Sequence, residues 1–408
     1  MIETATSARP DRLRQSGRPL RVLDITDAWS DEVSGGVRTY LQAKARALAG
    51  MDVEHVVIVP GERDDVESLG ATRLHRVAGP RVPVSPDYRM ILRPGAVRDI
   101  LRSERPDVVE VGSPFIVPWL VRRAMGTDGV PTVGFYHTDV VRTVAEPYAT
   151  GRLLEPVRMA ARAAARRLVR RVYRRFDVTV AASDVVAREL RDLGVRRVRT
   201  IGLGTDLDTF RPLPAAERLD PATWGVEPGV PVAVFAGRFC AEKRLDVLLE
   251  GHARVPLARR PHLLLAGGGP LLEEFRGRTA SRPRVTLLAY VRDRKEMARL
   301  YASCDMYVAP GPGETFGLSI AEAMACGLPV VAVDRGAAPE RVAGSGVAEL
   351  YRHENPQSCA RALESMAARL DPALRDRARR HAEETFDWRR TFREPVALYR
   401  ELVPVASG

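Results

Sequence analysis

Two glutamates, Glu314 and Glu322, stand eight positions apart in a glycine- and proline-rich stretch, residues 310–322 (PGPGETFGLSIAE). A strand-like run precedes the stretch, and a helix is expected to begin near Ser319, with Glu314 in the loop and Glu322 in the first turn. A helix N-terminus carries free N–H groups and the positive end of the helix dipole, which suit an anion or sugar hydroxyls. Carboxylates accept paired hydrogen bonds from vicinal hydroxyls, as on a ribose or a hexose. The stretch therefore indicates a site for a ligand that carries sugar rings.

Glu322 also has a structural explanation. Ser319 and Glu322 match a capping box, in which a serine and a glutamate three residues later satisfy the first N–H groups of a helix. The spacing alone does not separate this capping role from a ligand-binding role.

A basic pair, Arg238 and Lys243, follows another strand-like run in residues 237–244 (GRFCAEKR). A glycine at the strand end and two cations five residues apart can place both charges on one diphosphate, the arginine as a planar fork and the lysine as a point charge. Taken by itself, such a pair more often lies in a solvated loop.

Gly35 and Gly36 (in SGGVRTY) form a glycine-rich turn between the first expected strand and a helix. Glycine lets backbone N–H groups approach a phosphate closely. The chain has no GxGxxG motif with a ribose-binding acid, so a nicotinamide site is not expected.

Short β-rich runs alternate with longer helix-like ones from about residue 20, and this order must bring the residues above together. The strands expected in the first half are 21–26, 53–59, 107–111, 131–136 and 178–182, with helices such as 37–49 between several of them. After a turn-rich break at 203–214, the expected strands are 230–236, 261–266, 285–288, 305–310 and 329–333. The alternation predicts an α/β fold of two similar, doubly wound parallel sheets. Because such sheets bind ligands at the carboxyl ends of their strands, two facing sheets would share one inter-domain cleft.

The length of 408 residues predicts two domains of ordinary size. The expected division is a loose tail over 1–19, a first domain over 20–208, a second over 209–385 and a C-terminal segment over 386–408. A helix expected at 388–402 is amphipathic and could pack back on the first domain.

The net charge is +11, and nearly all of the positive charge is arginine, because the chain has only three lysines: Lys44, Lys243 and Lys295. An arginine bias can reflect a GC-rich genome, and a basic protein suits anionic partners in general. The chain has no basic motif interleaved with aromatics, so nucleic acid is not an expected partner.

The four cysteines form no CxxC pair, which argues against a disulfide framework or a zinc site and fits a reducing cytosol. No run approaches 18 apolar residues, and the first 20 residues lack the apolar core of a signal peptide. The expected location is therefore cytoplasmic.

Together these segments resemble the retaining glycosyltransferases of family 4, which have the GT-B fold of two facing Rossmann-like domains. The resemblance runs from about residue 20 to 404, and its most specific elements are the Glu–seven residues–Glu motif at Glu314 and Glu322 and the GRxxxEK motif at 237–243. Four shorter matches fall in the same order, at 34–37 (SGGV), 136–139 (YHTD), 181–184 (AASD) and 203–206 (LGTD). Two departures concern loop geometry: Arg244 stands where the family often has glycine, and Gly311 where it usually has serine.

The resemblance implies roles for the residues of the second domain, which would bind the nucleotide sugar. Arg238 and Lys243 look like the pair that neutralises the donor diphosphate, and Glu322 looks like the acid that binds the ribose. Glu314 would hold the donor hexose hydroxyls together with three backbone groups, and the nucleotide base would meet one more backbone group. These backbone positions are Phe316, Gly317 and Leu318 for the hexose and Val291 for the base.

The first domain would lie on the acceptor side. Gly36, next to Gly35, is similar to the glycine that contacts the phosphate and the acceptor side. His137 looks like the active-site histidine that faces the sugar, although a lone histidine at a strand end is usually structural.

The implied activity is a retaining hexosyl transfer from a nucleotide diphosphate sugar to a hydroxyl of a glycan, lipid or small molecule. GDP-mannose is favoured over a UDP-hexose as the donor, which would make the enzyme a mannosyltransferase. Such enzymes use a metal-independent, front-face displacement, so the nucleotide-sugar donor is the only small molecule expected and no cofactor is. The alternatives are a nucleotide-sugar 2-epimerase-like enzyme and a catalytically weak GT-B binding subunit.

An arginine-rich segment, residues 158–175, raises the question of a membrane. Its arginines recur at helical spacing, namely Arg158, Arg162, Arg166, Arg170 and Arg174, with Arg167, Arg171 and Arg175 in the neighbouring row. Apolar residues such as Met159, Val169 and Val172 lie between them. A basic amphipathic helix of this kind could lie on an anionic bilayer at the inner face of the membrane, near a lipid acceptor. A solvated arginine face is the alternative explanation.

Overall fold

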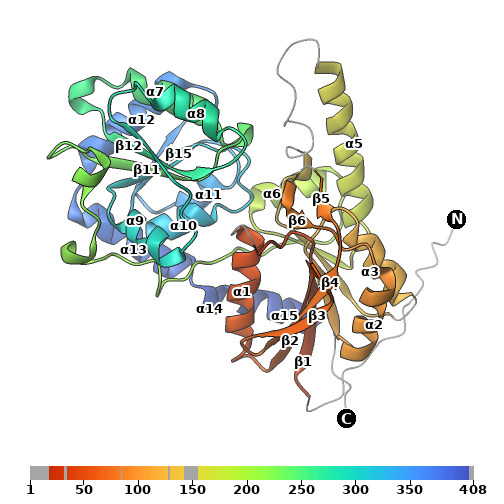
Figure 1. Ribbon diagram of the computed structural model, residues 1–408. Helices are drawn as coiled ribbons and strands as arrows, with labels where there is room; N and C mark the ends of the chain where they lie inside the picture. Colours follow the sequence, from red (N-terminus) through yellow and green to blue (C-terminus); the bar gives the residue numbers. More distant parts are fainter. Residues whose placement is uncertain (1–17, 32–34, 84, 127–128, 142–154, 404–408) are drawn as a thin grey trace, which may run out of the picture.

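The computed structural model of the protein describes residues 18–31, 35–83, 85–126, 129–141 and 155–403, which form two α/β units that lie next to each other (Figure 1). The predicted tail lies, but for its last two residues, outside the described residues, as does Ser34 of the SGGV match. Each unit has a sheet of mainly parallel strands with helices packed on it, which confirms the predicted fold class.

The first sheet has the strand order β10-β9-β8-β7-β1-β2-β4-β3, and only β3 runs antiparallel to its neighbour. Its strands are β1 (Leu20–Ile25), β2 (Val53–Gly61), β3 (Asp65–Leu69), β4 (Thr72–Ala78), β7 (Val108–Val111), β8 (Thr132–Tyr136), β9 (Val178–Ala181) and β10 (Val198–Thr200). The helices of this unit are α1 (Gly36–Leu48), α2 (Pro94–Glu104), α3 (Val117–Met125), α5 (Glu155–Tyr173) and α6 (Asp184–Asp192), and a hairpin of β5 (Arg81–Val82) and β6 (Ser85–Arg89) stands apart from the sheet. The sequence analysis did not predict β3, β4, β5, β6 or β10.

The second sheet is wholly parallel, in the order β13-β12-β11-β14-β15-β16. Its strands are β11 (Val232–Arg238), β12 (His262–Gly268), β13 (Val285–Leu288), β14 (Met306–Ala309), β15 (Val330–Val333) and β16 (Ala348–Tyr351). The helices around it are α7 (Leu245–Arg254), α8 (Leu272–Thr279), α9 (Arg294–Ala302), α10 (Leu318–Ala325), α11 (Ala338–Val342), α12 (Pro356–Arg369) and α13 (Pro372–Thr385). Short 3-10 turns occupy Ala215–Glu217, Pro221–Trp224, Ala241–Lys243 and Leu257–Arg259.

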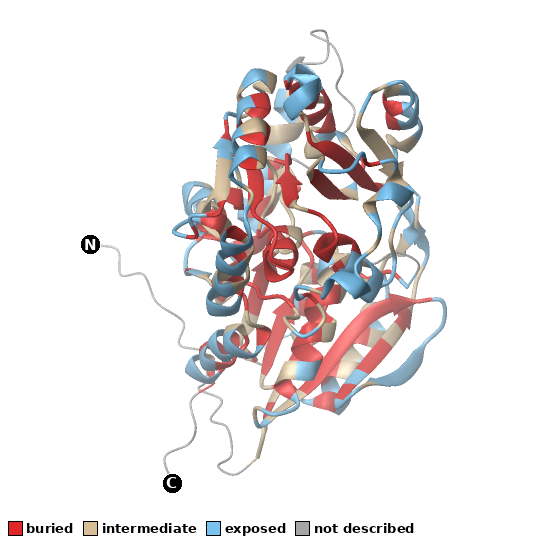
Figure 2. Ribbon diagram, turned by 90° about the vertical axis from the view of Figure 1, so that its left-hand side faces the viewer, coloured by how far each residue is buried: buried red, intermediate tan, exposed pale blue. Residues whose placement is uncertain are grey.

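Helices cover the strands, so the strands can be apolar along their whole length. β7, β14 and β15 are buried at every residue, and Figure 2 shows the strands as a buried interior behind helices whose outer faces are exposed. This burial explains why β14 and β15 appear in the sequence as continuous apolar runs and why β7 is apolar except for Glu110.

The chain returns to the first unit at its C-terminal end. Asp387 caps α14 (Trp388–Thr391), and α15 (Arg393–Leu402) follows after Phe392. The single helix predicted over 388–402 is therefore wrong, because Phe392 both ends α14 and starts α15. Figure 1 shows both helices beneath the first sheet, and the Trp388 ring lies 6.1 Å from the Tyr40 ring of α1.

A buried charge network joins α1, the first sheet and α15. Lys44 is fully buried, and its Nζ donates to Asp24 at 2.9 Å, to Glu110 at 3.1 Å and to the Tyr399 hydroxyl at 2.8 Å. Burial raises the pKa of Glu110 to about 7, although Lys44 opposes this shift. Burial would also raise the pKa of Asp24, but Lys44 and His55 together lower it below its usual range. One lysine thus faces two carboxyls, of which Glu110 holds its proton more readily.

This network predicts a stability that depends on pH. The Glu110 carboxyl binds its proton more tightly in the folded chain, so the free energy of unfolding falls as the pH rises from about 4.5 to about 7. At about 1.36 kcal/mol per pH unit, the loss is ~3 kcal/mol. We expect Glu110→Gln to lack this component, whereas Glu62→Gln, on an exposed side chain, should keep it. Urea unfolding at pH 5 and at pH 7.5 checks this, and an equal pH dependence in wild type and Glu110→Gln would contradict it.

Candidate active site

The loops that follow the strands of the two units meet through hydrogen bonds. The Thr315 hydroxyl, in the loop after β14, donates to the backbone oxygen of His137, after β8, at 2.8 Å. The Ser183 hydroxyl, after β9, donates to the backbone oxygen of Thr315 at 2.8 Å. Glu340 of α11 accepts the N–H groups of Asp184 and Val185 at 2.9 and 2.6 Å, at the start of α6. The carboxyl ends of the two sheets therefore face each other, as the sequence predicted.

The loop from β14 into α10 departs from one prediction. α10 begins at Leu318, within one residue of the predicted start, but Gly317, with a φ of +86°, is its N-cap and offers no side chain. The Ser319 hydroxyl is hydrogen-bonded to Tyr307 of β14 instead. The capping box between Ser319 and Glu322 is thus not formed, and Glu322 lies one turn into the helix.

Glu322 is buried and faces a cation that the sequence analysis missed. Arg294, the first residue of α9, donates to Glu322 Oε1 at 3.0 Å and also reaches the Thr39 hydroxyl of α1 at 3.5 Å. Burial raises the pKa of Glu322, and Arg294 partly offsets this rise. Arg294 is the only ion-pair partner of Glu322 among the described residues, so the second carboxylate oxygen can accept hydrogen bonds from a ligand.

Lys243 and Glu314 form an ion pair between the 3-10 turn after β11 and the loop after β14. Burial alone would lower the pKa of Lys243, but the Glu314 carboxylate raises it above its usual value. The amine therefore remains charged. Gly311 lies beside the pair, since a Cβ there would approach Lys243 Cδ to 3.1 Å.

Arg244, one of the two departures in loop geometry, adopts a conformation that suits glycine. Its φ of +48° is left-handed, a conformation that costs most residues about 1–2 kcal/mol and that glycine adopts readily. Its guanidinium donates to Glu354 at 2.7 Å and thereby ties the turn to the end of β16. The loop keeps the backbone course that a glycine would give it.

Arg238 ends β11 and is exposed, with no carboxylate in an ion pair with it in the described part of the chain. It is near Tyr88 of β6. Burial raises the pKa of Tyr88, and the positive charge of Arg238 partly offsets this rise. A Cβ on Gly35 would lie 3.6 Å from the Tyr88 hydroxyl, so Tyr88 joins Arg238 to the glycine turn of the first unit. Gly269, in residues 267–270 (GGGP) after β12, lets the backbone of Phe239 approach closely, because a Cβ there would stand 2.7 Å from the Phe239 oxygen.

The N-termini of α1 and α10 face each other. Gly36 and Leu318 are the first residues of these helices, and a Cβ on Gly36 would stand 3.3 Å from Leu318 Cδ1. Helix N-termini present N–H groups and a positive dipole end, so two that converge form an anion site. Side chains of Lys243 and Arg238 add two positive charges from the second unit.

Residues 34–209 of the chain match the family model described as Glycosyltransferase Family 4, and residues 230–369 match the one described as Glycosyl transferases group 1. A GDP-mannose-dependent alpha-(1-6)-phosphatidylinositol dimannoside mannosyltransferase of Mycobacterium tuberculosis is 31% identical over 379 residues, which cover 91% of this chain and 93% of that protein. The chain belongs to glycosyltransferase family 4.

Two further proteins are similar to this chain, one in sequence and one in fold. A GDP-mannose-dependent alpha-mannosyltransferase of Mycolicibacterium smegmatis is 32% identical over 329 residues, or 79% of this chain and 82% of that protein. The sucrose-phosphate synthase of Thermosynechococcus elongatus superposes with a TM-score of 0.76 and 21% identity, over 94% of this chain and 99% of that one. This family 4 chain is thus a glycosyltransferase with the GT-B fold, and the epimerase and binding-subunit alternatives are not favoured.

His137 has a defined arrangement in this family 4 site. Its Nε2–H donates to the Gly112 oxygen at 2.5 Å, and its Nδ1 accepts from the Thr138 hydroxyl at 2.8 Å. Burial lowers its pKa, so the ring is neutral near pH 7. Both ring nitrogens are hydrogen-bonded within the protein, where β7, β8 and the β14 loop meet.

The remaining predicted residues lie around the same loops. Phe316 is buried, and the Arg341 guanidinium lies 4.6 Å from its ring centre. Val291 is partly buried after β13.

Asp27, after β1, is a residue of these loops that the sequence analysis missed. It is hydrogen-bonded to Ser113, after β7, and burial raises its pKa. A polar residue directly after a buried strand was the available signal.

Proposed function

We propose that this family 4 glycosyltransferase transfers mannose from GDP-mannose, with retention of configuration, to a hydroxyl of a membrane lipid or glycan. The convergence of Arg238, the Lys243–Glu314 pair and the N-termini of α1 and α10 supports a site for a sugar diphosphate. The two mannosyltransferases above, whose names specify GDP-mannose, support the choice of donor. A UDP-hexose is the other donor that the sequence leaves open.

In this proposal the diphosphate lies against Arg238, Lys243 and the helix N-termini. A lysine has three N–H donors, so Lys243 can hold Glu314 and a phosphate oxygen together. Glu314 then accepts from the hexose hydroxyls, with the backbone of residues 316–318 beside it. Glu322 accepts from the ribose, held in place by Arg294, and the base lies at the Val291 backbone.

The proposed reaction is a front-face displacement. The acceptor oxygen attacks the anomeric carbon on the side from which the diphosphate departs, the bond from that carbon to the diphosphate breaks, and the acceptor proton passes to the leaving phosphate oxygen. Fixed positive groups stabilise the charge that develops there. Gly36 and Asp27 lie on the acceptor side, and the proposal needs no cofactor beyond the donor.

We place the enzyme in the cytoplasm, at the inner face of an anionic membrane that α5 can contact. No helix in the described part of the chain is long and apolar enough to cross a bilayer. Val169 and Val172 are buried in the first unit, so this half of α5 has no apolar face exposed at the outer surface. Val157 and Met159, 64% and 62% exposed, are the apolar residues that α5 can place on the surface of a bilayer.

A set of nucleotide sugars tests the proposed donor. The purified protein is incubated with GDP-mannose, GDP-glucose, UDP-glucose and UDP-galactose, and the released nucleoside diphosphate is measured with water as the slow acceptor. We expect GDP from GDP-mannose and far less release from the others. Release of UDP alone would refute the choice of donor, and no release from any donor would refute the transferase site.

Glu322→Gln is expected to weaken nucleotide binding more than the chemical step. A hydrogen bond to a charged group contributes about 1.5–3 kcal/mol, so the Kd for GDP should rise by roughly ten- to hundredfold. Calorimetric titration with GDP and with 2′,3′-dideoxy-GDP measures it: the missing hydroxyls should weaken binding to wild type but scarcely to the variant. Glu250→Gln, an exposed glutamate on α7, is the matched control. If the Kd rises equally from GDP to 2′,3′-dideoxy-GDP in wild type and in Glu322→Gln, Glu322 does not bind the ribose.

A further inference from the structure

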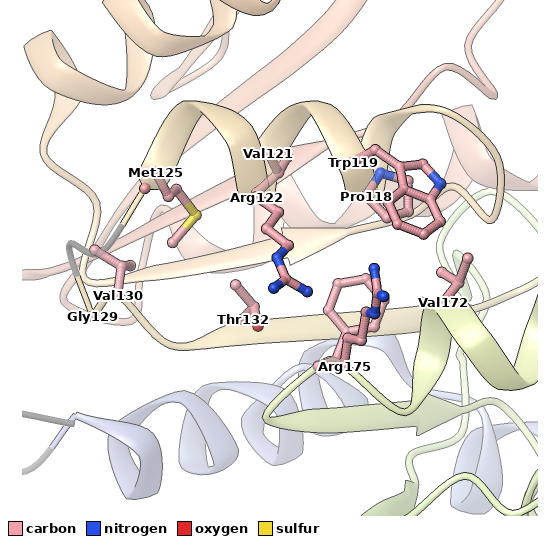
Figure 3. A pocket seen from close by; sticks show the side chains of 12 residues that line it. Pro118, Trp119, Val121, Arg122, Met125, Gly129, Val130, Thr132, Val172 and Arg175 are labelled. Atoms are coloured by element: carbon pink, nitrogen blue, oxygen red, sulfur yellow. The ribbon is translucent and has the colours of Figure 1, made fainter. Parts of the chain in front are cut away.

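A hollow of about 290 Å³ lies between α3 and the C-terminal end of α5 (Figure 3). Most of its wall is apolar, and the larger side chains that form it are Trp119, Val121, Met125, Val130, Val172 and Phe176. An apolar cavity of about 150 Å³ already takes a benzene molecule, so this hollow has room for a chain of several methylene groups. Removing such groups from water is favourable, and the wall therefore suits a hydrocarbon.

The hollow does not belong to the donor site. Thr132, which lines it, is the first residue of β8, whereas His137 directly follows the last residue of that strand. At about 3.3 Å per residue, the two ends of β8 are separated by roughly 15 Å. The hollow opens at the amino-terminal edge of the first sheet, and the donor site lies at the carboxyl edge.

Positive charge gathers around the hollow. Arg122 and Arg175 line it, and Figure 3 shows Arg122 pointing from α3 toward Arg175. The guanidiniums of Arg175 and Arg171 lie 4.7 and 5.3 Å from the centre of the Trp119 ring. Desolvation and then the neighbouring Arg122, Arg171 and Arg174 lower the pKa of Arg175. None of these four arginines forms an ion pair within the described ranges, so an anion would relieve their mutual repulsion.

An apolar hollow and a cationic mouth fit a molecule that has both a hydrocarbon chain and an anionic group. A soluble anion would use the arginines but leave the apolar wall in water, and a neutral lipid would use the wall but leave the arginines without a partner. An anionic phospholipid can fill the apolar hollow with an acyl chain and place its phosphate at the arginines, because it carries both groups in one molecule. The α5 arginines extend the same cationic surface from the mouth of the hollow.

We propose that the hollow between α3 and α5 binds one acyl chain of an anionic phospholipid, whose phosphate is held by Arg122 and Arg175. The site extends the membrane contact proposed for α5 from adsorption on the surface to capture of a single lipid. It is separate from the transfer reaction, so binding can be measured without a donor or an acceptor.

Tryptophan fluorescence tests the chain directly, because Trp119 forms part of the wall. The full-length protein is mixed with vesicles of phosphatidylglycerol that carries bromine atoms in the middle of its acyl chains, which quench only a tryptophan in contact with them. We expect quenching in wild type, loss of most of it in Trp119→Phe, and much less with brominated phosphatidylcholine. Vesicle sedimentation measures binding of each variant in parallel.

The double variant Arg122→Gln with Arg175→Gln tests the phosphate contact. An arginine near an anionic surface contributes about 1 kcal/mol to binding, so the loss of two arginines should weaken vesicle binding roughly tenfold or more. The matched control is Arg361→Gln with Arg377→Gln, two exposed arginines on α12 and α13 of the second unit, which should bind as wild type does. Circular dichroism confirms that every variant is folded.

Three results would overturn the proposal. Vesicle binding without quenching of Trp119 would show adsorption by charge alone. Equal quenching by phosphatidylglycerol and phosphatidylcholine would remove the anionic headgroup from the site. An equal loss of binding in the two double variants would show that net charge, rather than Arg122 and Arg175, decides it. Normal release of nucleoside diphosphate in each case would leave the transferase proposal intact.

Discussion

Lys243→Ala is expected to lower the turnover of the nucleotide sugar by more than about a hundredfold. Lys243 is a protonated amine paired with Glu314, and in our proposal it lies where the charge of the leaving diphosphate develops. Removing one such preorganised group from an active site typically costs a hundred- to a thousandfold in kcat. Release of GDP from GDP-mannose gives the rate, and calorimetric titration with GDP separates the loss in binding from the loss in chemistry.

Two comparisons make this prediction specific. Lys295→Ala removes the same charge from an exposed position on α9 and should leave turnover unchanged. Lys243→Arg keeps the charge but alters the donor geometry, so its rate should lie between those of wild type and Lys243→Ala. Near-normal turnover in folded Lys243→Ala would refute the placement of the diphosphate.

Glu314→Ala is expected to have an effect of similar size for a different reason. In our proposal Glu314 holds the hexose hydroxyls and, through its ion pair, fixes the direction of Lys243. The variant should therefore lose both the grip on the sugar and the orientation of the amine, and turnover should fall by more than about a hundredfold. Glu273→Ala, on an exposed side chain of α8, is the control that should behave as wild type.

Deoxy donors separate the two contributions of Glu314. A mannose donor that lacks the hydroxyl bound by Glu314 should react much more slowly with wild type than GDP-mannose does. With Glu314→Ala, the deoxy donor and GDP-mannose should react at similar rates. A set of singly deoxygenated GDP-mannose analogues identifies that hydroxyl. If each analogue loses as much rate with the variant as with wild type, Glu314 does not bind the sugar.

The sequence predicted the parts of the site that follow from order along the chain. In a doubly wound sheet every strand ends at the same edge, so residues after β8, β11 and β14 had to meet once the strands were recognised. His137, Arg238 and Glu314 are of this kind. Gly36 and Leu318 are as well, since both start helices at those edges.

Pairings between side chains could not be read in the same way. Lys243 and Glu314 are 71 residues apart, and Arg294 and Glu322 are 28 apart, on elements whose mutual rotation the sequence does not specify. Ser319 shows the converse problem. Its spacing to Glu322 satisfies a capping pattern, yet Gly317 in a left-handed conformation starts the helix one residue earlier and leaves the pattern unused.

Most of the strands that the sequence analysis missed lie in the first unit, and β16 is the one that it missed in the second sheet. β3 (DVESL) is exposed along almost its whole length, and Val66 and Leu69 are its only apolar residues, so it lacks the apolar signal of a buried strand. α5 shows the opposite case, because its helical period was clear but not the use of its apolar residues. Those near its C-terminal end pack into the core, and only the N-terminal half exposes Val157 and Met159.

We propose above all that the site between the two units transfers the sugar with retention of configuration. The acceptor then attacks the anomeric carbon on the face from which the diphosphate leaves. Real-time NMR of GDP-α-mannose labelled with ¹³C at the anomeric carbon tests it without any knowledge of the acceptor, because water then takes the acceptor's place. We predict that α-mannose appears first, together with GDP, and that both signals form at least about a hundredfold more slowly with Lys243→Ala. Initial formation of β-mannose, or an unchanged rate with Lys243→Ala, would contradict the account.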